Sequence, residues 1–258
     1  MTNIFKNMYQ YRELLKTSVK KEVRGKYKNS FLGVIWSFLN PLLQIAVYAI
    51  VFPLILRNNQ ENYVIFLCCG LIPWTFFATS INRSAFSFIE NGNILKKVYF
   101  PREIIPISVV TSEAINFMIS TLIILGFVIF GGLGISKYIV FYPLVLLVQY
   151  FVVLSISIII ASICVYLRDL QHFIGVALQL LFYVAPVVYS PNMIPEKFQW
   201  VLKINPMTYI INAYRDIFYN KTMLEIKPLM TVFVLAIIAF GIGYFIFSIL
   251  QKGFAEQL

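Results

Sequence analysis

Long apolar runs separated by short polar segments constrain this chain more than any other feature. The run from 105 to 130 contains one charged residue, Glu113. A helix needs about 20 mostly apolar residues to cross the hydrocarbon core of a bilayer. Of all 258 residues, 60% are hydrophobic and 12% are charged, whereas a soluble domain carries roughly 25% charged residues. The sequence therefore predicts an all-α membrane protein.

Six such runs divide the chain, and we expect them to form a single transmembrane domain over residues 1–258. The second run contains Gly70 and Pro73. A span tolerates such interruptions only where neighbours satisfy the freed backbone groups, so this helix should face the bundle. The expected spans cover residues 32–56, 64–81, 105–130, 138–167, 173–189 and 228–250.

The distribution of basic residues predicts the orientation. Two thirds of the 21 lysines and arginines lie in the N-terminal segment, the loop after the second span, the turn at Arg168 and the C-terminal tail. Basic residues collect on the cytoplasmic side. We therefore expect a multi-pass protein of the cytoplasmic (inner) membrane with both termini in the cytoplasm. This rule also explains the net charge of +10, so no nucleic-acid partner is expected.

The N-terminal segment, residues 1–31, is expected to lie on the cytoplasmic membrane surface. Apolar residues recur at close to helical spacing over 4–28, while lysines cover the other face. Such a helix can anchor the chain to anionic lipid, and it can also position a lipid-linked substrate. The segment lacks the short apolar core and cleavage site of a secretory signal.

Two connecting regions have the composition of functional segments. The first, residues 82–105, is expected to hold a short amphipathic helix that breaks at Pro101 and leads into a span near Pro106. The second, residues 190–228, is broken by Pro191, Pro195 and Pro206 into pieces too short to span. A re-entrant or interfacial helical hairpin on the external side fits this pattern.

Polar residues inside the third span are candidates for function. Glu113, Asn116 and Ser120 share one helical face. A carboxylate in a span is costly and is by default a functional hypothesis. It can contact substrate, or it can have a structural role by pairing with Asn116 or a basic group nearby. With one histidine and three cysteines in apolar runs, we expect free thiols and no metal site.

Four motifs follow one another along nearly the whole chain. They are Lys26-Tyr27 with Trp36 and Pro41; Lys96-Lys97 before Phe100-Pro101-Arg102-Glu103; Arg168-Asp169-Leu170; and Asn205-Pro206 with Tyr209 and Tyr214-Arg215. Together they resemble polysaccharide-exporting permeases of ATP-binding-cassette (ABC) transporters, in which Arg is common where Lys26 stands.

The resemblance implies ATP-driven export of a polysaccharide linked to a polyprenyl pyrophosphate, such as O antigen or teichoic acid. It implies a homodimer of this permease with two copies of a separate ATPase, which binds the ATP and Mg. This chain is then a transport subunit without catalytic residues, a nucleotide site or a cofactor of its own. The resemblance assigns ATPase coupling to Lys96, Lys97, Phe100, Pro101, Arg102, Glu103, Arg168 and Asp169, and an external gate to Asn205, Pro206, Tyr209 and Arg215.

Two further sets of residues are candidates for contacts with such a substrate. Sugar rings stack on aromatic faces, although ordinary helix packing also explains each aromatic residue. Basic residues can attract a pyrophosphate head group, although the positive-inside rule explains them too. The candidate path is Tyr48, Trp74, Phe76, Phe77, Tyr183 and Tyr189, and the head-group entrance is Arg24, Lys26, Lys28 and Arg83.

Three alternatives remain open. A drug or lipid exporter permease of the same superfamily shares the architecture. A membrane-embedded transferase or hydrolase needs convergent catalytic groups at one depth, and no obvious set is present. A passive channel needs no partner and leaves the Lys96–Glu103 loop unexplained. A neighbouring gene for an ATPase, or copurification of the chain with an ATPase, would distinguish an exporter from the enzyme and the passive channel.

Overall fold

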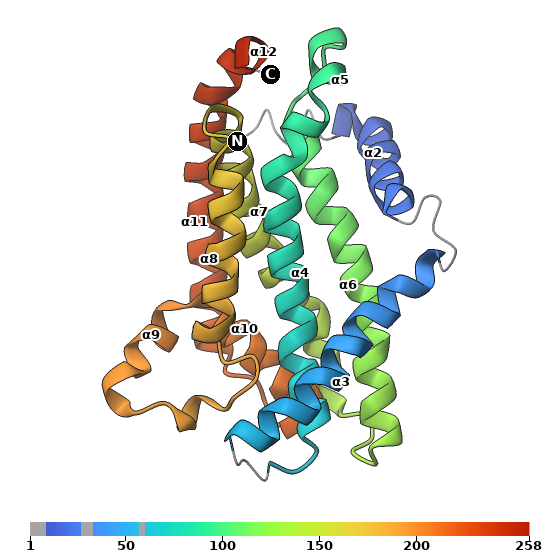
Figure 1. Cartoon of the computed structure of the whole chain (residues 1–258), viewed down its shortest axis with the longest axis vertical. Helices are drawn as coiled ribbons and strands as arrows, with labels where there is room; N and C mark the ends of the chain where they lie inside the picture. The colour runs from blue at the N-terminus through green and yellow to red at the C-terminus, as the bar shows by residue number, and fades with distance from the viewer. Residues whose placement is uncertain (1–8, 27–32, 57–59, 258) are drawn as a thin grey trace.

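The computed structural model describes residues 9–26, 33–56 and 60–257, and within these ranges the chain is helical without a β-strand (Figure 1). The predicted all-α fold is confirmed. The main helices are α2 (Arg12–Gly25), α3 (Trp36–Leu56), α4 (Tyr63–Glu90), α5 (Gly92–Lys97), α6 (Ile104–Phe130), α7 (Tyr142–Tyr166), α8 (Leu170–Val184), α9 (Gln199–Ile204), α10 (Pro206–Arg215), α11 (Ile226–Leu250) and α12 (Phe254–Gln257).

Five segments are long and apolar enough to cross a membrane, namely α3, α4, α6, α7 with the short turn before it, and α11. The remaining expected span, 173–189, corresponds to α8, which is apolar but has only 15 residues. At 1.5 Å per residue it is about 22 Å long, shorter than the roughly 30 Å of a hydrocarbon core. It nevertheless runs along the bundle with the long helices and packs against α4 and α7 (Figure 1). Five of the six expected spans thus correspond to helices long enough to cross a membrane, and the remaining one corresponds to a shorter apolar helix.

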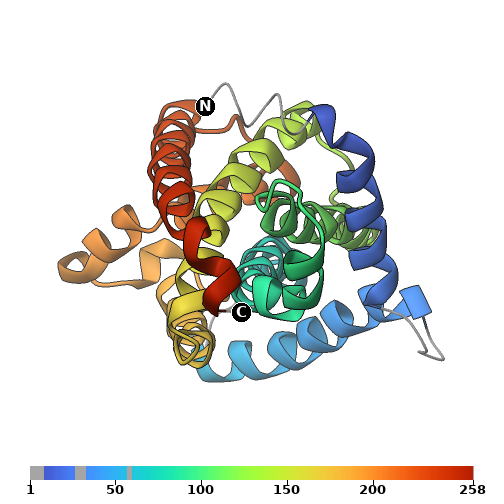
Figure 2. The same ribbon diagram turned by 90° about the horizontal axis from the view of Figure 1, so that it is seen from above.

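Helix α4 lies at the centre of the bundle, where it packs against α6 and α7 (Figure 2). Its Gly70 and Pro73 are buried, as predicted. Gln149 of α7 donates a hydrogen bond of 2.8 Å to the Pro73 carbonyl. A Cβ at position 70 would come within 2.5 Å of the Val187 carbonyl oxygen, so only glycine fits here. The interruptions in α4 thus face other parts of the chain.

Helix α3 crosses the bundle obliquely and is mostly exposed within this chain (Figure 1). Its main contacts with the long helices, among the described residues, are with α4 and α6. Leu43, Val47, Ile50 and Leu54 expose apolar side chains along it. Such a surface is suited to lipid or to another membrane-embedded chain.

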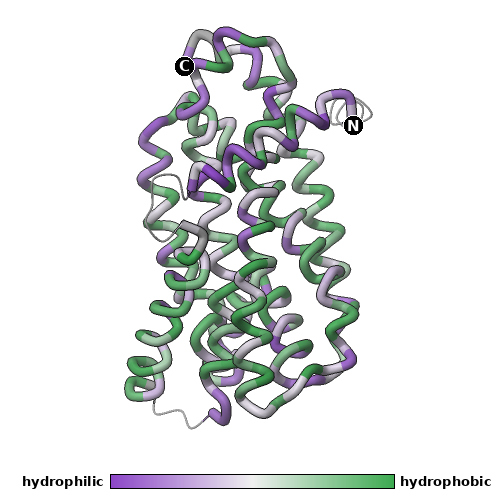
Figure 3. Tube along the Cα trace, turned by 90° about the vertical axis from the view of Figure 1, so that its right-hand side faces the viewer, coloured by the Kyte–Doolittle hydropathy of each residue, from purple (hydrophilic) through white to green (hydrophobic). Residues whose placement is uncertain are grey.

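Helices α2, α5 and α12 lie at one end of the bundle, hereafter the α5 end (Figure 1). Hydrophobic residues run along the long helices, and hydrophilic residues gather toward the ends (Figure 3). Helix α4 continues past Arg83 to Glu90, so the expected end of the second span at 81 is wrong for the helix itself. Part of the 82–105 connection is therefore α4. The 190–228 region consists of short helical pieces, as predicted.

Candidate functional site

The first connecting loop presents two lysines at the α5 end. Lys96 and Lys97 form the last turn of α5 and are exposed. The expected break at Pro101 is placed too late, because the helix ends at Lys97 and Val98 is already extended. Phe100 and Pro101 are half-buried. Lys96 and Lys97 are thus the accessible cations of this loop.

The Arg102-Glu103 pair faces the protein more than solvent. The Arg102 guanidinium donates a hydrogen bond to the Gln251 carbonyl and lies over the Phe254 ring. Glu103 is only 4% exposed. The Glu103 side chain is therefore buried in this chain, at the start of α6, and does not present a surface to a docked subunit.

The second connecting turn lies close to the C-terminal helix. Arg168 and Asp169 are exposed, and α8 begins at the next residue, Leu170. One Nη atom of Arg168 lies 3.2 Å from the Gln257 carbonyl oxygen. The predicted coupling residues of both loops are thus connected to the segment that follows α11.

Glu113 is the centre of an ion-pair network between α2, α4 and α6. Its Oε1 accepts a hydrogen bond of 2.5 Å from Arg83 Nη1, and its Oε2 lies 3.0 Å from Lys26 Nζ. Arg83 Nη2 binds Oε2 of Glu22 at 2.5 Å. Glu113 is 3% exposed, so two cations compensate a carboxylate that is costly to bury. Glu113 thus has the structural role that the sequence analysis considered, as the partner of nearby basic groups.

This network changes the interpretation of the head-group candidates. Lys26 and Arg83 are paired with two carboxylates, so their positive charge is balanced locally. An incoming anion would have to compete with Glu22 and Glu113. Arg24 is exposed on α2. Lys28, the fourth candidate, lies outside the described residues.

A hollow of about 390 Å³, lined by both polar and apolar side chains, lies beside the network, between α3, α4 and α6. Asn116, the other intramembrane polar candidate, lies on its wall. Polar groups at membrane depth must be satisfied by protein, water or a polar ligand. The hollow can therefore accept a hydrated or hydroxyl-rich group. Its other lining residues include Ser37, Asn40, Gln44, Thr75, Thr79 and Ser120, with the aromatic residues Trp36, Phe76 and Phe117.

A second hollow of about 280 Å³ lies between α3, α4 and α8. It brings together Tyr48, Trp74 and Tyr183, three of the six candidate path residues. Gln44 and Thr75 line both hollows. The two hollows thus border the same part of α3 and join aromatic faces to amide and hydroxyl groups.

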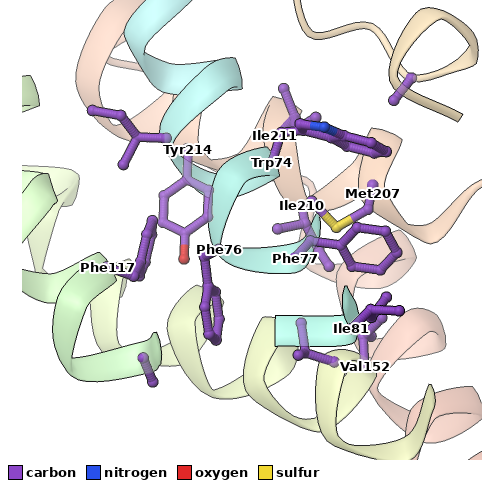
Figure 4. Packing of buried hydrophobic residues seen from close by; sticks show 14 of the residues in the cluster. Trp74, Phe76, Phe77, Ile81, Phe117, Val152, Met207, Ile210, Ile211 and Tyr214 are labelled. Carbon is purple, nitrogen blue, oxygen red and sulfur yellow. The ribbon is translucent and has the colours of Figure 1, made fainter. Parts of the chain in front are cut away.

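The other aromatic candidates pack inside the chain. Phe76 stacks on Phe117 with ring centroids 5.2 Å apart, next to Tyr214 (Figure 4). Phe77 is 5% exposed and packs among buried residues, including Trp74 at 5.3 Å between ring centroids (Figure 4). Phe77 therefore lies in the packed interior of this chain and lines neither hollow.

The last aromatic candidate, Tyr189, fixes the end of α8. Its hydroxyl lies 3.0 Å from the carbonyl oxygens of both Tyr183 and Val184. Tyr189 is half-buried. Its hydroxyl thus serves a local backbone contact in this structure.

The first residues of the predicted external gate form the N-terminus of α10. Asn205 caps α10 by accepting a hydrogen bond from the Met207 N–H at 3.0 Å, and Pro206 occupies the first turn. This is the usual chemistry of a helix start. Tyr209 donates a hydrogen bond of 2.9 Å to the Lys203 carbonyl. The Asn205-Pro206-Tyr209 motif therefore fixes the junction of α9 and α10.

Arg215, the remaining residue of the predicted gate, is a buried cation. It is 3% exposed, and its guanidinium lies 3.5 Å from the Phe66 ring centroid. One Nη atom donates a hydrogen bond of 2.8 Å to the Val187 carbonyl. Burial lowers the pKa of Arg215 to about 9. Arg215 therefore holds the end of α8 from inside, by a cation–π contact and one carbonyl.

Comparison with known proteins adds to this geometry. Residues 13–219 match the protein family described as ABC-2 type transporter. The chain belongs to the ABC-2 type transporter family. It is 37% identical over 247 residues, 95% of each chain, to the O-antigen export system permease protein RfbA of Klebsiella pneumoniae. The RfbA protein of Myxococcus xanthus is 34% identical over 260 residues, the full length of both chains. The polysialic acid transport protein KpsM of Escherichia coli is 21% identical over 203 residues, 76% of this chain.

Some interactions of this ABC-2 family member were not predicted from its sequence. Gln149 of α7 is fully buried, and its Oε1 accepts a hydrogen bond of 3.0 Å from the Tyr214 hydroxyl. Tyr63 donates a hydrogen bond of 2.7 Å to the Val188 carbonyl. A glutamine within an apolar run is a signal of the same kind as Glu113, and it could have been found. The pairing of Glu22 with Arg83 has no such local signal.

Proposed function

We propose that this chain is the permease subunit of an exporter for a polysaccharide linked to a polyprenyl pyrophosphate. Identity of 34–37% over nearly the full length with O-antigen export permeases carries this proposal. The weaker similarity to a polysialic acid transport protein supports a glycan cargo over a drug. O antigen and teichoic acid are two cargoes of this chemical class.

A separate ATPase drives export in this proposal. The ABC-2 family membership supports such a partner. The exposed Lys96 and Lys97 of α5 and the exposed Arg168-Asp169 turn offer it two docking points. We place these loops and both termini in the cytoplasm, and the chain in the cytoplasmic membrane, because basic residues concentrate there.

The polymer passes beside α3 in this proposal. The hollow between α3, α4 and α8 presents aromatic rings and amides to one side of α3. Because α3 is mostly exposed among the described residues, with its main long-helix contacts on α4 and α6, it can shift without breaking the core. A second copy of this permease then supplies the other wall of the channel, and its contact surface includes the exposed apolar side of α3.

The lipid-linked end of the cargo approaches along α2 in this proposal. Arg24 is exposed on this helix. The paired Lys26 and Arg83 lie where α2 meets α4 and α6. A pyrophosphate carries enough negative charge to compete with carboxylates for these cations.

Copurification and transport together test the proposal. The chain is expressed with candidate ABC ATPase subunits from the same organism, and the complex is placed in proteoliposomes with a polyprenyl-pyrophosphate glycan. We expect a stable complex, hydrolysis of ATP and ATP-dependent translocation of the glycan. Lys96→Glu with Lys97→Glu should weaken the complex, whereas Lys203→Glu, a charge reversal in α9, should not.

Other outcomes contradict the proposal. Translocation without ATP would indicate a passive channel. ATP hydrolysis stimulated by apolar drugs but not by the glycan would indicate a drug exporter. A stable chain that binds no ATPase would remove the exporter assignment.

A further inference from the structure

The segment after α11 folds back over the α5 end of the bundle. It consists of a 3-10 turn, Gln251–Gly253, followed by α12, Phe254–Gln257. Helix α12 lies at the same end as α5 (Figure 1). We refer to Gln251–Gln257 as the C-terminal segment. It contacts both loops to which the sequence assigned ATPase coupling.

The contact with the first loop is made by Arg102. Its guanidinium donates a hydrogen bond to the Gln251 carbonyl. The same group lies 5.7 Å from the Phe254 ring centroid, within the range of a cation–π contact. Arg102 follows directly after the exposed part of the loop, so the position of that loop depends on the C-terminal segment.

The contact with the second loop is made by Tyr166 and Arg168. The Tyr166 hydroxyl donates a hydrogen bond of 2.7 Å to the Leu250 carbonyl. Arg168 donates one of 3.2 Å to the Gln257 carbonyl. The first bond ends on the last residue of α11, directly before the C-terminal segment, and the second ends on the last residue of the segment. The second loop is therefore held on both sides of the segment.

Phe254 fixes the C-terminal segment against the bundle. It is fully buried, and its ring centroid lies 4.9 Å from that of Phe88 in α4 and 6.1 Å from that of Tyr166. Next to it, a Cβ on Gly253 would come 2.5 Å from the Tyr166 hydroxyl. A larger residue at 253 would therefore make the Tyr166 side chain shift, and Phe254 contributes one aromatic contact to each element that it joins.

We propose that the C-terminal segment joins the two loops into one docking surface for the ATPase, with Phe254 as the positioning residue. The inference rests on the proposed function and adds a third component to the coupling surface. A hollow of about 380 Å³ between Arg168, Asp169 and Gln257 lies on this surface. Lys96, Lys97 and Lys252 are also exposed at this end. The surface is therefore predominantly basic and fits a partner face rich in carboxylates.

The connection has a mechanical consequence. A force applied to the first loop reaches the C-terminal segment through Arg102 and the second loop through Tyr166 and Arg168. Both loops then move with α11 instead of independently. Truncating Phe254 removes the shared contact while leaving the exposed docking side chains in place.

A distance measurement without any partner tests whether the C-terminal segment holds the two loops together, an arrangement that we call the clamp. Spin labels are placed at Tyr99→Cys in the first loop and His172→Cys beside the second, both at exposed sites. The native thiols of Cys68, Cys69 and Cys164 are buried, which limits unwanted labelling. We expect one narrow distance distribution in the parent protein and a broad one in Phe254→Ala. Phe245→Ala is the matched control, because Phe245 is an exposed phenylalanine of α11.

ATPase affinity is the second measurement. We expect Phe254→Ala to weaken binding about tenfold, because the two loops would then have to be ordered relative to each other when the ATPase binds. Phe245→Ala should bind normally. If Phe254→Ala does not fold, Tyr166→Phe replaces it, since it removes only the bond to the Leu250 carbonyl. That variant should broaden the distance distribution to a smaller extent.

The outcomes are distinguishable. An unchanged distance distribution in folded Phe254→Ala overturns the clamp. A broadened distribution with unchanged ATPase affinity overturns the shared docking surface. If the parent protein binds no ATPase, the proposed function fails together with the docking surface, while the distance measurement still decides whether the clamp exists.

Discussion

Arg83 of α4 and Glu113 of α6 form a hydrogen-bonded ion pair, with 2.5 Å between Nη1 and Oε1, around a carboxylate that is 3% exposed. Lys26 at the end of α2 binds the other carboxylate oxygen. The position of the N-terminal helix thus depends on a charge inside the third span. This dependence makes the network the first place to test the structure.

Glu113→Gln should destabilise the protein. Arg83 and Lys26 would lose their shared carboxylate, and we expect the free energy of unfolding to fall by about 3 kcal/mol, the lower end for a broken buried pair. The side chains of Arg83 and Lys26 are 32% and 33% exposed, which keeps the loss from being larger. Thermal unfolding in detergent measures the change. Glu13→Gln on the exposed face of α2 is the control, and equal melting of both variants would contradict the prediction.

Gln149→Leu should destabilise the protein, because it removes a buried side chain that makes two hydrogen bonds. The substitution leaves the Tyr214 hydroxyl and the Pro73 carbonyl without their partner. We expect a loss of about 1 kcal/mol, since measured hydrogen bonds between membrane helices are modest. Adding Tyr214→Phe removes the orphaned hydroxyl and should recover part of the loss. A double-mutant cycle with no interaction between the two sites would show that the bond is not formed.

Gly70→Ala should disturb the contact between α4 and the end of α8. The new Cβ would lie 2.5 Å from the Val187 oxygen and 3.1 Å from an Arg215 nitrogen. Such overpacking costs about 1–3 kcal/mol. Gly126→Ala is a matched control, because nothing lies within 4 Å of its Cβ position. If both variants unfold at the same temperature, the close approach at Gly70 is not present.

Tyr183→Ala should slow export of a glycan without loss of stability. Tyr183 is exposed within this chain and lines the hollow beside α3. A ring contact is worth about 0.5–1.5 kcal/mol, which corresponds to roughly two- to tenfold in transport at low substrate concentration. Tyr183→Phe keeps the ring and should stay near the rate of the unchanged protein. Equal loss in both variants would point to the hydroxyl instead.

The sequence predicted the long helices because apolar length alone determines what can cross a bilayer. It placed the end of α4 too early, since α4 continues for two turns beyond Arg83 with polar residues among its apolar ones. Hydropathy marks the membrane depth of a helix and not its end. The start of α6 at Ile104 was predicted to within one residue, because Pro101 and Pro106 limit where the helix can begin.

The candidate site was predicted in parts. Glu113 was identified as a carboxylate that needs a partner, but the partner Arg83 lies 30 residues away in sequence, and Lys26 lies 87 residues away. Pairing over such distances is decided by tertiary packing, which leaves no local pattern. The burial of Phe77 and Arg215 was missed for the same reason. The identity of an aromatic or cationic residue does not show whether its side chain faces a passage or the interior of the protein.

The small buried surface of α3 has a consequence for how the protein is made. The ribosome synthesises α3 before α4 and α6, the helices on which it packs. With a mean hydropathy of 1.9 over its span, it can leave the translocon and enter the lipid without waiting for them. Its later docking then depends on few contacts. Membrane insertion of α3 during synthesis and a shift of α3 during transport would thus both depend on the stability of this helix in lipid by itself.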